Sequence, residues 1–317
     1  MMYKKNYVIG VDIGGTNIKL GIVSDAGEIV ARGRIKTAEV AADKECLIQA
    51  VVESVAGLLA ARGLRQDQVQ GVGFGVPGLV DFDRGVVLTL TNIFGWKNVP
   101  LQKLAEAKLG LPVRVDNDVN GMALAEAKFG AGRGYRNMIC MTLGTGVGAG
   151  LILEGKLYRG EGFCAGELGH VPLNENGPAC NCGGRACFER YVGNATLLAG
   201  ARDFFKRQDI TLEDVYALAA RGDSRALDFW YGVGTVVGYG LVGAVNLLNP
   251  RLIVIGGGVA KSLRFMKTAI AATIRERAMG VPAQLVKVAA AKLGDDAGVI
   301  GAGLLMTNDK IQMTKFK

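Results

Sequence analysis

The chain has 317 residues, half of them apolar and about a fifth charged, with a net charge of +8 at pH 7. This composition is typical of a globular protein with two domains or lobes and a sizeable core. The longest apolar runs, such as residues 252–255, are too short to predict a membrane span, and no hydrophobic signal region precedes the first strand. We therefore expect a cytoplasmic protein without a membrane partner. Lys and Arg form no block interleaved with aromatic residues, so we expect no nucleic-acid partner, although the charge suits an anionic ligand such as a nucleotide.

Residues 7–35 predict three consecutive strands with a glycine turn between the first two. Apolar, mostly β-branched residues flank Gly14-Gly15-Thr16, and neither a Walker P-loop nor a GxGxxG motif is present. The backbone N–H groups and the Thr hydroxyl at such a turn suit phosphate oxygens, and Asp12 at the strand end could hold a metal-bound water. A tight hairpin without a ligand is an equally good interpretation.

Strands and helices alternate along the rest of the chain. The expected elements are a helix over 44–61, a strand over 69–76 ending at Pro77-Gly78, a loop over 92–96, a helix over 100–110, a strand over 113–115, a helix over 121–129, a strand–turn–strand over 137–153, mainly helices over 195–248, a strand over 252–255, a strand near 285–289 and a last helix to about 306. This alternation predicts an α/β protein with a sheet in each lobe and a ligand cleft between the lobes.

Two further glycine-rich turns follow predicted strands. They are Gly144-Thr145-Gly146 and Gly256-Gly257-Gly258. Together with Gly14-Gly15-Thr16 they suggest several backbone loops that bind one polyanion. The alternative is three tight turns in a chain that contains 47 glycines.

Asp118 follows a short strand at the expected start of a helix. Asp116, Asn117 or Asp118 could each serve as a helix N-cap. Asp118 could instead be a catalytic base or orient a substrate hydroxyl, because a helix N-terminus keeps a carboxylate ionised. The sequence leaves both interpretations open.

The only histidine of the chain, His170, lies ten residues before a Cys-X-Cys-X4-Cys run. This run contains Cys180, Cys182 and Cys187, and the acidic residues Glu167 and Glu189 flank the segment. Zinc accepts Cys3His ligation, and disulfides are uncommon in the cytosol, so the spacing predicts structural zinc. The alternatives are ordinary thiols or a zinc-ribbon binding module, and the single cluster within an α/β chain argues against the second.

Over nearly its whole length the chain resembles sugar kinases of the ROK family (repressors, open reading frames and kinases), and within it most closely the glucokinases. The motifs that carry the resemblance appear in order at residues 12–19, 75–78, 92–96, 117–118, 143–148, 166–170, 180–189, 249–250, 256–258 and 294–298. The resemblance implies a two-lobed, actin-like fold of the hexokinase type, related to ribonuclease H. It also implies an N-terminal lobe of residues 1–117 with a returning helix over about 298–317, and a C-terminal lobe of 118–297 that contains the zinc loop 167–189.

The same resemblance implies a role for each matching residue. Asp118 would be the base for the sugar 6-hydroxyl. The other sugar contacts would be Gly78, Asn92, Asn117, Glu167, His170 and Glu189; the ATP contacts would be Asp12 (near Mg2+), Gly14, Gly15, Thr16, Lys19, Gly144, Thr145, Gly146, Gly256, Gly257 and Gly258; and the zinc ligands would be His170, Cys180, Cys182 and Cys187. His170 would give one ring nitrogen to zinc and face the sugar with the other.

Two positions depart from the family pattern. Ala186 stands where the family usually has glycine, so its methyl group could crowd the zinc turn, and Asp116 stands where glutamate is common.

The expected reaction is ATP-dependent phosphorylation of glucose, with a homodimer or homotetramer as the family habit. Kinases for fructose, allose, N-acetylglucosamine or N-acetylmannosamine stay open, as does a donor other than ATP. A sugar-responsive repressor of the same family is the distant alternative, because only six residues precede the first strand here.

Overall fold

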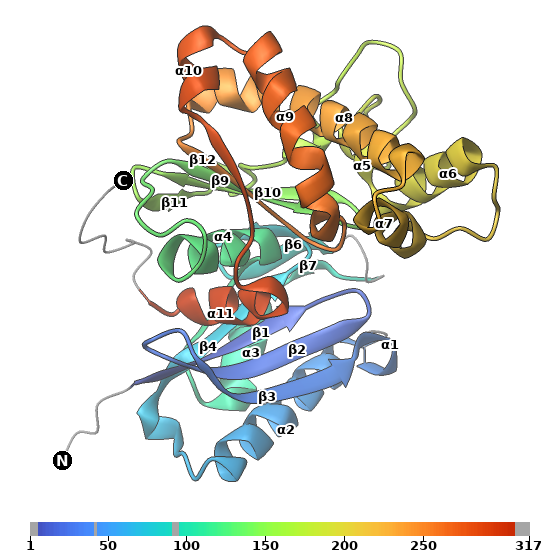
Figure 1. Cartoon of the computed structure of the whole chain (residues 1–317). Coiled ribbons are helices and arrows are strands. Elements are labelled where there is room, and N and C mark those ends of the chain that lie inside the picture. Colours follow the sequence, from blue (N-terminus) through green and yellow to red (C-terminus); the bar gives the residue numbers. More distant parts are fainter. Residues whose placement is uncertain (1–5, 41–42, 91–94, 308–317) are drawn as a thin grey trace. The chain divides into compact units, whose positions relative to one another are not determined.

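The computed structural model describes residues 6–40, 43–90 and 95–307 (Figure 1). It divides into two compact units. Unit 1 contains the residues up to Gly134, then Gly150–Ala165, and those from Leu293 on; unit 2 contains Tyr135–Ala149 and Gly166–Lys292. The α/β class is confirmed. The lobe boundary expected between residues 117 and 118 stays a prediction, and residues 118–134 belong to unit 1 here.

Unit 1 is built on a five-stranded sheet. In the order of the sheet its strands are β3 (Ile29–Lys36), β2 (Asn17–Ser24), β1 (Tyr7–Ile13), β4 (Val69–Val76) and β8 (Val113–Asn117). The first three pair antiparallel, as the predicted meander requires, whereas β1, β4 and β8 run parallel. Most residues of β1 and β4 are buried because both faces of the sheet carry helices.

Helices cover the two faces of this sheet differently (Figure 1). On one side are α1 (Thr37–Val40), α2 (Lys44–Ala61) and α3 (Leu101–Leu109), and on the other are α4 (Asp118–Lys128) and α11 (Ala297–Leu304). The α11 backbone touches the strands directly: a Cβ at Gly10 would lie 1.8 Å from the Val299 oxygen, and one at Gly73 would lie 1.7 Å from the Ala302 oxygen. Glycine is therefore required at both positions.

A small antiparallel sheet extends unit 1 beyond β4. It consists of β5 (Gly78–Asp81), β6 (Val86–Leu90) and β7 (Lys97–Val99), and a 3-10 turn over Gln66–Gln68 precedes β4. Residues 91–94, which include the expected sugar contact Asn92, lie outside the described residues.

The second five-stranded sheet has the same mixed pattern as the first. Its order is β11 (Lys156–Tyr158), β10 (Val147–Leu153), β9 (Met138–Leu143), β12 (Leu252–Gly256) and β13 (Lys287–Ala290). The accompanying helices are α5 (Glu189–Val192), α6 (Asn194–Phe205), α7 (Leu212–Ala220), α8 (Ser224–Leu248), α9 (Leu263–Arg277) and α10 (Gly280–Leu285), with 3-10 turns over Leu168–His170 and Val259–Ser262. A further 3-10 turn over Gly294–Asp296 belongs to unit 1 and leads into α11. β9, β12 and β13 are parallel, so their carboxyl ends share one edge.

Helix α8 is long and apolar enough to cross a membrane by length and composition, which the sequence analysis did not anticipate. Its glycines and alanines separate short apolar runs, so no single run signals the whole segment. Gly234 and Gly238 let α9 approach closely, since a Cβ at Gly238 would lie 2.6 Å from Thr273 Cβ. We interpret α8 as a helix with one face in the core of unit 2.

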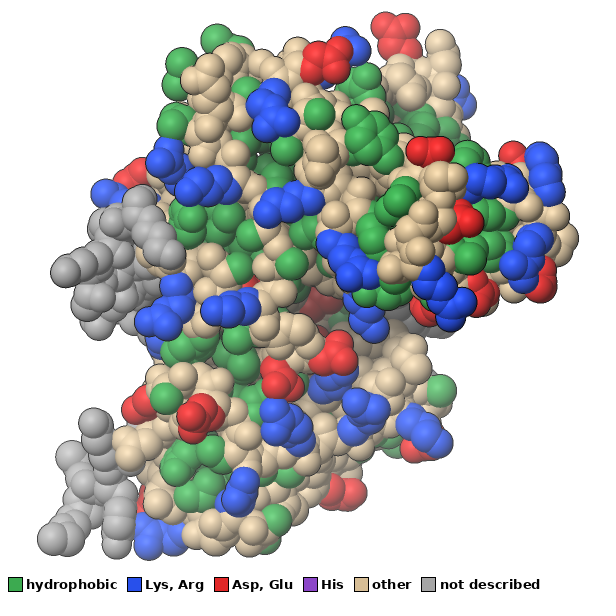
Figure 2. All heavy atoms as spheres, viewed as in Figure 1, with side chains coloured by type: hydrophobic (Ala, Val, Ile, Leu, Met, Phe, Trp, Pro, Cys, Tyr) green, Lys and Arg blue, Asp and Glu red, His purple; other side chains and the backbone are tan. Residues whose placement is uncertain are grey.

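Charge is mixed on the face of the molecule that Figure 2 shows. On the face displayed in Figure 2, Lys and Arg side chains are interspersed with Asp and Glu over both units. That face offers no continuous basic stripe of the kind that follows a nucleic-acid backbone.

Candidate active site

The start of α4 is fixed by the residue before it. Asn117 is the N-cap: its side-chain oxygen accepts hydrogen bonds from the N–H groups of Val119 and Asn120, at 2.9 and 3.3 Å. Its side-chain nitrogen donates to the Gly78 oxygen at 3.1 Å. Asp118 is therefore the first helical residue, three positions earlier than expected, and is half-buried at the positive end of the helix.

Asp116 lies buried beside the start of α4 and bonds the residues that form it. One carboxylate oxygen accepts from the Asn117 N–H at 2.7 Å and from the Asn120 side chain at 2.9 Å. The other accepts from Arg159 Nε at 2.7 Å, and the Arg159 guanidinium lies 3.6 Å from the Phe82 ring centre. Burial raises the pKa of Asp116, while Arg159 and the hydrogen bonds oppose that rise. This network fixes the backbone on which Asn117 and Asp118 stand.

Asp12 lies at the same edge of the sheet. The register places it beside Gly75 on β4, which pairs in turn with Asp116 on β8. Desolvation raises the pKa of Asp12, and the facing Lys19 ammonium lowers it. A Cβ at Gly298 would lie 2.4 Å from Asp12 Oδ2, so only glycine there leaves the carboxylate in place. Ligands of α/β folds collect at such carboxyl ends of parallel strands.

The Gly14-Gly15-Thr16 turn joins β1 and β2 beside Asp12. The first residue of α1 fixes the backbone of this turn. Thr37 donates its N–H to the Thr16 oxygen at 3.0 Å and its hydroxyl to the Gly14 oxygen at 2.7 Å. Gly15 and Thr16 are exposed. Both carbonyls are thus occupied, while the Thr16 side chain faces solvent and is accessible to a ligand.

The Cys3His residues come together in unit 2. The ligand atoms of His170, Cys180, Cys182 and Cys187 all lie within 4.8 Å of one another. Cys180 Sγ is 3.7 Å from His170 Nδ1, and Cys182 Sγ is 3.6 Å from Cys187 Sγ. Tetrahedral zinc with bonds of about 2.0–2.3 Å needs separations of this size between its ligand atoms. The donor set and its geometry therefore fit zinc.

The acidic residues flank this cluster as expected. His170 Nε2, the ring nitrogen away from Cys180, lies 3.8 Å from a Glu167 carboxylate oxygen. Partial burial raises the pKa of Glu167, His170 lowers it and Glu189 raises it again. Glu189 accepts the Val147 N–H at 2.9 Å, immediately after the Gly144–Gly146 turn. The zinc loop and this glycine turn are therefore connected through one carboxylate.

Two of the three glycine turns lie together. A Cβ at Gly257 would lie 2.3 Å from the Leu143 oxygen, so residues 256–258 pack on the end of β9, directly before the Gly144–Gly146 turn. The start of α6 is bonded to the same turn, because the Asn194 N–H donates to the Gly144 oxygen at 2.8 Å. Both turns belong to unit 2, whereas Gly14–Thr16 belongs to unit 1.

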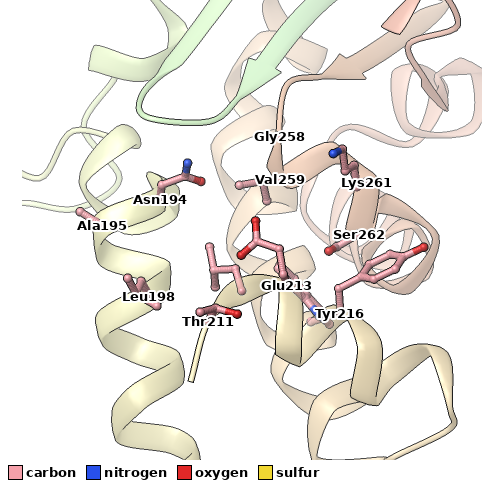
Figure 3. Close-up of a pocket in the computed structure, with 12 residues that line it drawn as sticks. Asn194, Ala195, Leu198, Thr211, Glu213, Tyr216, Gly258, Val259, Lys261 and Ser262 are labelled. Atoms are coloured by element: carbon pink, nitrogen blue, oxygen red, sulfur yellow. The ribbon is translucent and has the colours of Figure 1, made fainter. Parts of the chain in front are cut away.

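A pocket of about 500 Å3 opens beside these turns (Figure 3). Its lining includes Asn194, Leu198, Thr211, Glu213, Tyr216, Trp230, Gly258, Val259, Lys261 and Ser262. In Figure 3, α6 with Asn194 lies on one side, Val259 and Lys261 lie on the other, and the Glu213 carboxylate points into the space between them. The indole Nε1 of the buried Trp230 has no hydrogen-bond partner among the described residues. The volume and mixed lining suit a flat heterocycle with attached polar groups.

Several residues of these sites carry no recognisable signal in the sequence. Arg159 is 43 positions from Asp116, and no local pattern marks it as a partner. Asn194, Glu213, Tyr216 and Trp230 come from three helices, and only the packing of the helices brings them to one pocket. Asn is common at the start of helices, so the position of Asn194 in the sequence does not by itself predict a pocket residue.

The comparison with known protein families is consistent with this arrangement. A profile of the ROK family matches residues 8–309. The chain belongs to the ROK family. It is 36% identical to a glucokinase of Halalkalibacterium halodurans, over 98% of this chain and 97% of that protein. The ROK sugar-kinase resemblance expected from the sequence motifs is confirmed.

Solved structures give the same fold. A ROK family glucokinase from Streptomyces griseus, in complex with glucose and AMPPNP, superposes with a TM-score of 0.80 at 34% identity, covering 94% of this chain and 98% of that one. A ROK family transcriptional regulator superposes with a TM-score of 0.85 at 26% identity, covering 96% of this chain and 79% of that one. The hexokinase-type α/β fold is thus confirmed, and it is shared by kinases and regulators.

Proposed function

We propose that this protein is a glucokinase that transfers the terminal phosphoryl group of ATP to the 6-hydroxyl of glucose. The observation that carries the proposal is near-complete alignment with glucokinases at 31–36% identity, together with the similarity to a glucokinase solved with glucose and AMPPNP. The chain also contains a carboxylate at a helix start and glycine turns suited to phosphates, as phosphoryl transfer requires.

Asp118 is the proposed base. It would align the 6-hydroxyl with the terminal phosphorus and accept the proton as the new O–P bond forms. Its ordinary carboxylate chemistry suffices because the hydroxyl becomes acidic late in a loose transition state. Asn117, Glu167, His170 and Glu189 would hydrogen-bond the remaining hydroxyls; the Gly78 carbonyl already accepts from Asn117, so we propose that it positions this side chain.

The glycine turns and the unit 2 pocket are the proposed ATP contacts. The Gly144–Gly146 and Gly14–Thr16 turns would bind phosphate oxygens through N–H groups after their first residues, because the Gly14 and Gly144 N–H groups donate to Asn17 and Gly146 within the turns. Lys19 would lie nearby, and Gly256–Gly258 would lie along the adenosine. Trp230 and Glu213 could then pair with polar atoms of the adenosine in the pocket. Magnesium bound with ATP would neutralise phosphate charge, and Asp12 would hold its water ligands.

The zinc cluster is proposed to be structural. Three thiolates and His170 would fill a tetrahedral ion and leave no open position for chemistry. Ligation through Nδ1 would fix the imidazole ring and leave Nε2 on the side of Glu167, where it can bind a sugar hydroxyl.

A coupled assay of a hexose panel with ATP tests the proposal. We expect glucose to give the highest kcat/KM among glucose, fructose, allose, mannose, N-acetylglucosamine and N-acetylmannosamine. Preference for another sugar would move the protein to a different ROK kinase class, and no turnover with any sugar would favour a regulator. Replacing ATP with ADP or polyphosphate in the same assay identifies the donor. The homodimer or homotetramer and the cytoplasmic location stay predictions; light scattering tests the first.

A further inference from the structure

Glu126, near the end of α4, is fully buried. Its carboxylate accepts hydrogen bonds from two backbone segments that are far apart from each other in the sequence. One oxygen accepts the Ala131 N–H at 2.7 Å, and the other accepts the Leu293 N–H at 2.8 Å. Its own carbonyl accepts from the N–H groups of Gly130 and Gly132. Hydrogen bonds to a carboxylate are about twice as strong as neutral ones, so both segments are held firmly.

The two segments lie at two of the four places where the chain passes between the units. The chain first leaves unit 1 after Gly134 and finally returns to it at Leu293. Ala131 and Leu293 therefore lie within a few residues of the first and the last crossing. A Cβ at Gly130 would lie 2.0 Å from Glu126 Oε2, so the first segment approaches the carboxylate as closely as a glycine allows.

Glu126 also shares a rigid element with Asp118. Eight residues of α4 separate the two, about 12 Å along a helix axis. Helix α11, which follows Leu293 after one 3-10 turn, crosses α4 without intervening side chains: a Cβ at Gly301 would lie 2.0 Å from the Gly121 oxygen. A displacement of either crossing segment therefore acts on the helix that begins with Asp118.

We propose that Glu126 is a positioning residue that anchors the first and last crossings to the helix carrying Asp118. A displacement of the first or the last crossing segment would reach α4 through this carboxylate, whereas the crossings after Ala149 and Ala165 are not bonded to it in the contacts described. The kinetic part of this inference rests on the proposed glucokinase function, whereas the anchoring does not.

The test combines hydrogen exchange with kinetics on Glu126→Gln. The amide nitrogen of Gln can face only one of the two N–H groups as a competing donor, so one hydrogen bond is lost and the other weakened. We expect exchange of the Ala131 and Leu293 amides to rise about tenfold or more. The kcat for glucose should fall about tenfold to hundredfold. The KM for ATP should change less than about threefold, because neither Glu126 nor the two residues whose N–H groups it accepts, Ala131 and Leu293, line the unit 2 pocket.

Glu106→Gln is the matched control. Glu106 is also a helical glutamate of unit 1 that accepts a backbone N–H, from Val113 at 3.0 Å, but no crossing lies beside it. We expect faster exchange at Val113 with kcat unchanged.

Each outcome decides the inference. Unchanged exchange at both amides in Glu126→Gln, or faster exchange with an unchanged kcat, would overturn it. If that variant does not fold, the wild-type chain decides, because unprotected amides at Ala131 and Leu293 contradict the anchoring. A wild-type protein without kinase activity overturns the proposed function and the kinetic role, and the exchange result still decides the anchoring.

Discussion

The start of α4 and the Cys3His loop are stabilised by different means. At α4, the Asp116 and Asn117 side chains are fixed by a helix N-cap, a buried ion pair and a backbone carbonyl, all supplied by the chain itself. In the loop, residues 171–187 contain two isolated β-bridges and a few turn hydrogen bonds, and their thiols and imidazole converge on one point. The side chains at the start of α4 are therefore fixed by protein contacts, whereas the side chains of the loop are arranged as ligands for a metal ion.

The two sites should therefore respond differently to substitution. A substitution at α4 should alter chemistry or local stability one residue at a time. A substitution in the loop should remove the metal and release every residue that the metal orients, including His170 beside Glu167.

Asp118→Asn should give the largest effect and tests whether the α4 site acts through one residue. We expect kcat to fall about 10^2–10^4-fold, the range for loss of a general base. Glucose affinity and the melting temperature should stay near wild type, because the Asn oxygen can still accept the Val119 N–H as Asp118 Oδ1 does at 2.9 Å. Coupled kinetics and calorimetric titration measure the two quantities. Near wild-type turnover would refute the base assignment.

Cys182→Ser tests the metal dependence of the loop. We expect bound zinc, measured by elemental analysis, to fall from one per chain to near zero, and the melting temperature to fall with it. The KM for glucose should rise about tenfold or more, since outer-sphere residues lose their orientation. Cys46→Ser, at an exposed cysteine outside the loop, is the control and should change none of these. A zinc-free protein with a normal glucose KM would contradict the proposed link between metal and sugar site.

Arg159→Met tests the buried ion pair under α4. Removing one partner leaves the Asp116 charge buried and should destabilise the protein by about 3–5 kcal/mol at pH 7. Burial already raises the pKa of Asp116, and loss of Arg159 raises it further. An acid whose folded pKa is raised loses stability as pH rises through the interval between its unfolded and folded values, so the deficit should shrink as pH falls through that folded value.

Denaturant unfolding at pH 5 and pH 7 measures this trend. The double variant with Asp116→Asn should recover part of the stability at pH 7 and lose the pH dependence. An equal deficit at both pH values, with no recovery in the double variant, would show that packing of Arg159 on Phe82 matters more than its charge.

Local patterns made the strand meander, the Cys3His cluster and the glycine turns predictable. Asp12, Gly14 and Thr16 are adjacent in sequence, and three cysteines within eight residues restrict the loop strongly. The N-cap of α4 stayed open among Asp116, Asn117 and Asp118, because all three are good N-cap residues and only the partners chosen in the fold identify Asn117. Arg159, Trp230 and Glu126 were not predicted, since each acts through residues far away in the sequence.

Ala186 allows the smallest and most local test of the zinc loop. Its φ of 56° is in the left-handed region, its side chain is fully buried, and a Cβ at Gly177 would lie 2.6 Å from its methyl group. This backbone conformation favours glycine, and the alanine carries a strain of about 1–2 kcal/mol. Glycine adds unfolded-state entropy of about 0.4–1 kcal/mol, so Ala186→Gly should stabilise the protein by about 0–1.5 kcal/mol.

A rise in melting temperature of about 1–3 °C in Ala186→Gly, with the zinc content unchanged, is the expected result. Ala179→Gly is the matched control, because Ala179 lies in the same loop, pairs with Arg185 in an isolated bridge and is not among the residues with positive φ. It should destabilise the protein by about 0.5–1 kcal/mol. If both glycine variants destabilised the protein equally, the positive φ at position 186 would carry no net strain, and the strain assigned to Ala186 would be wrong.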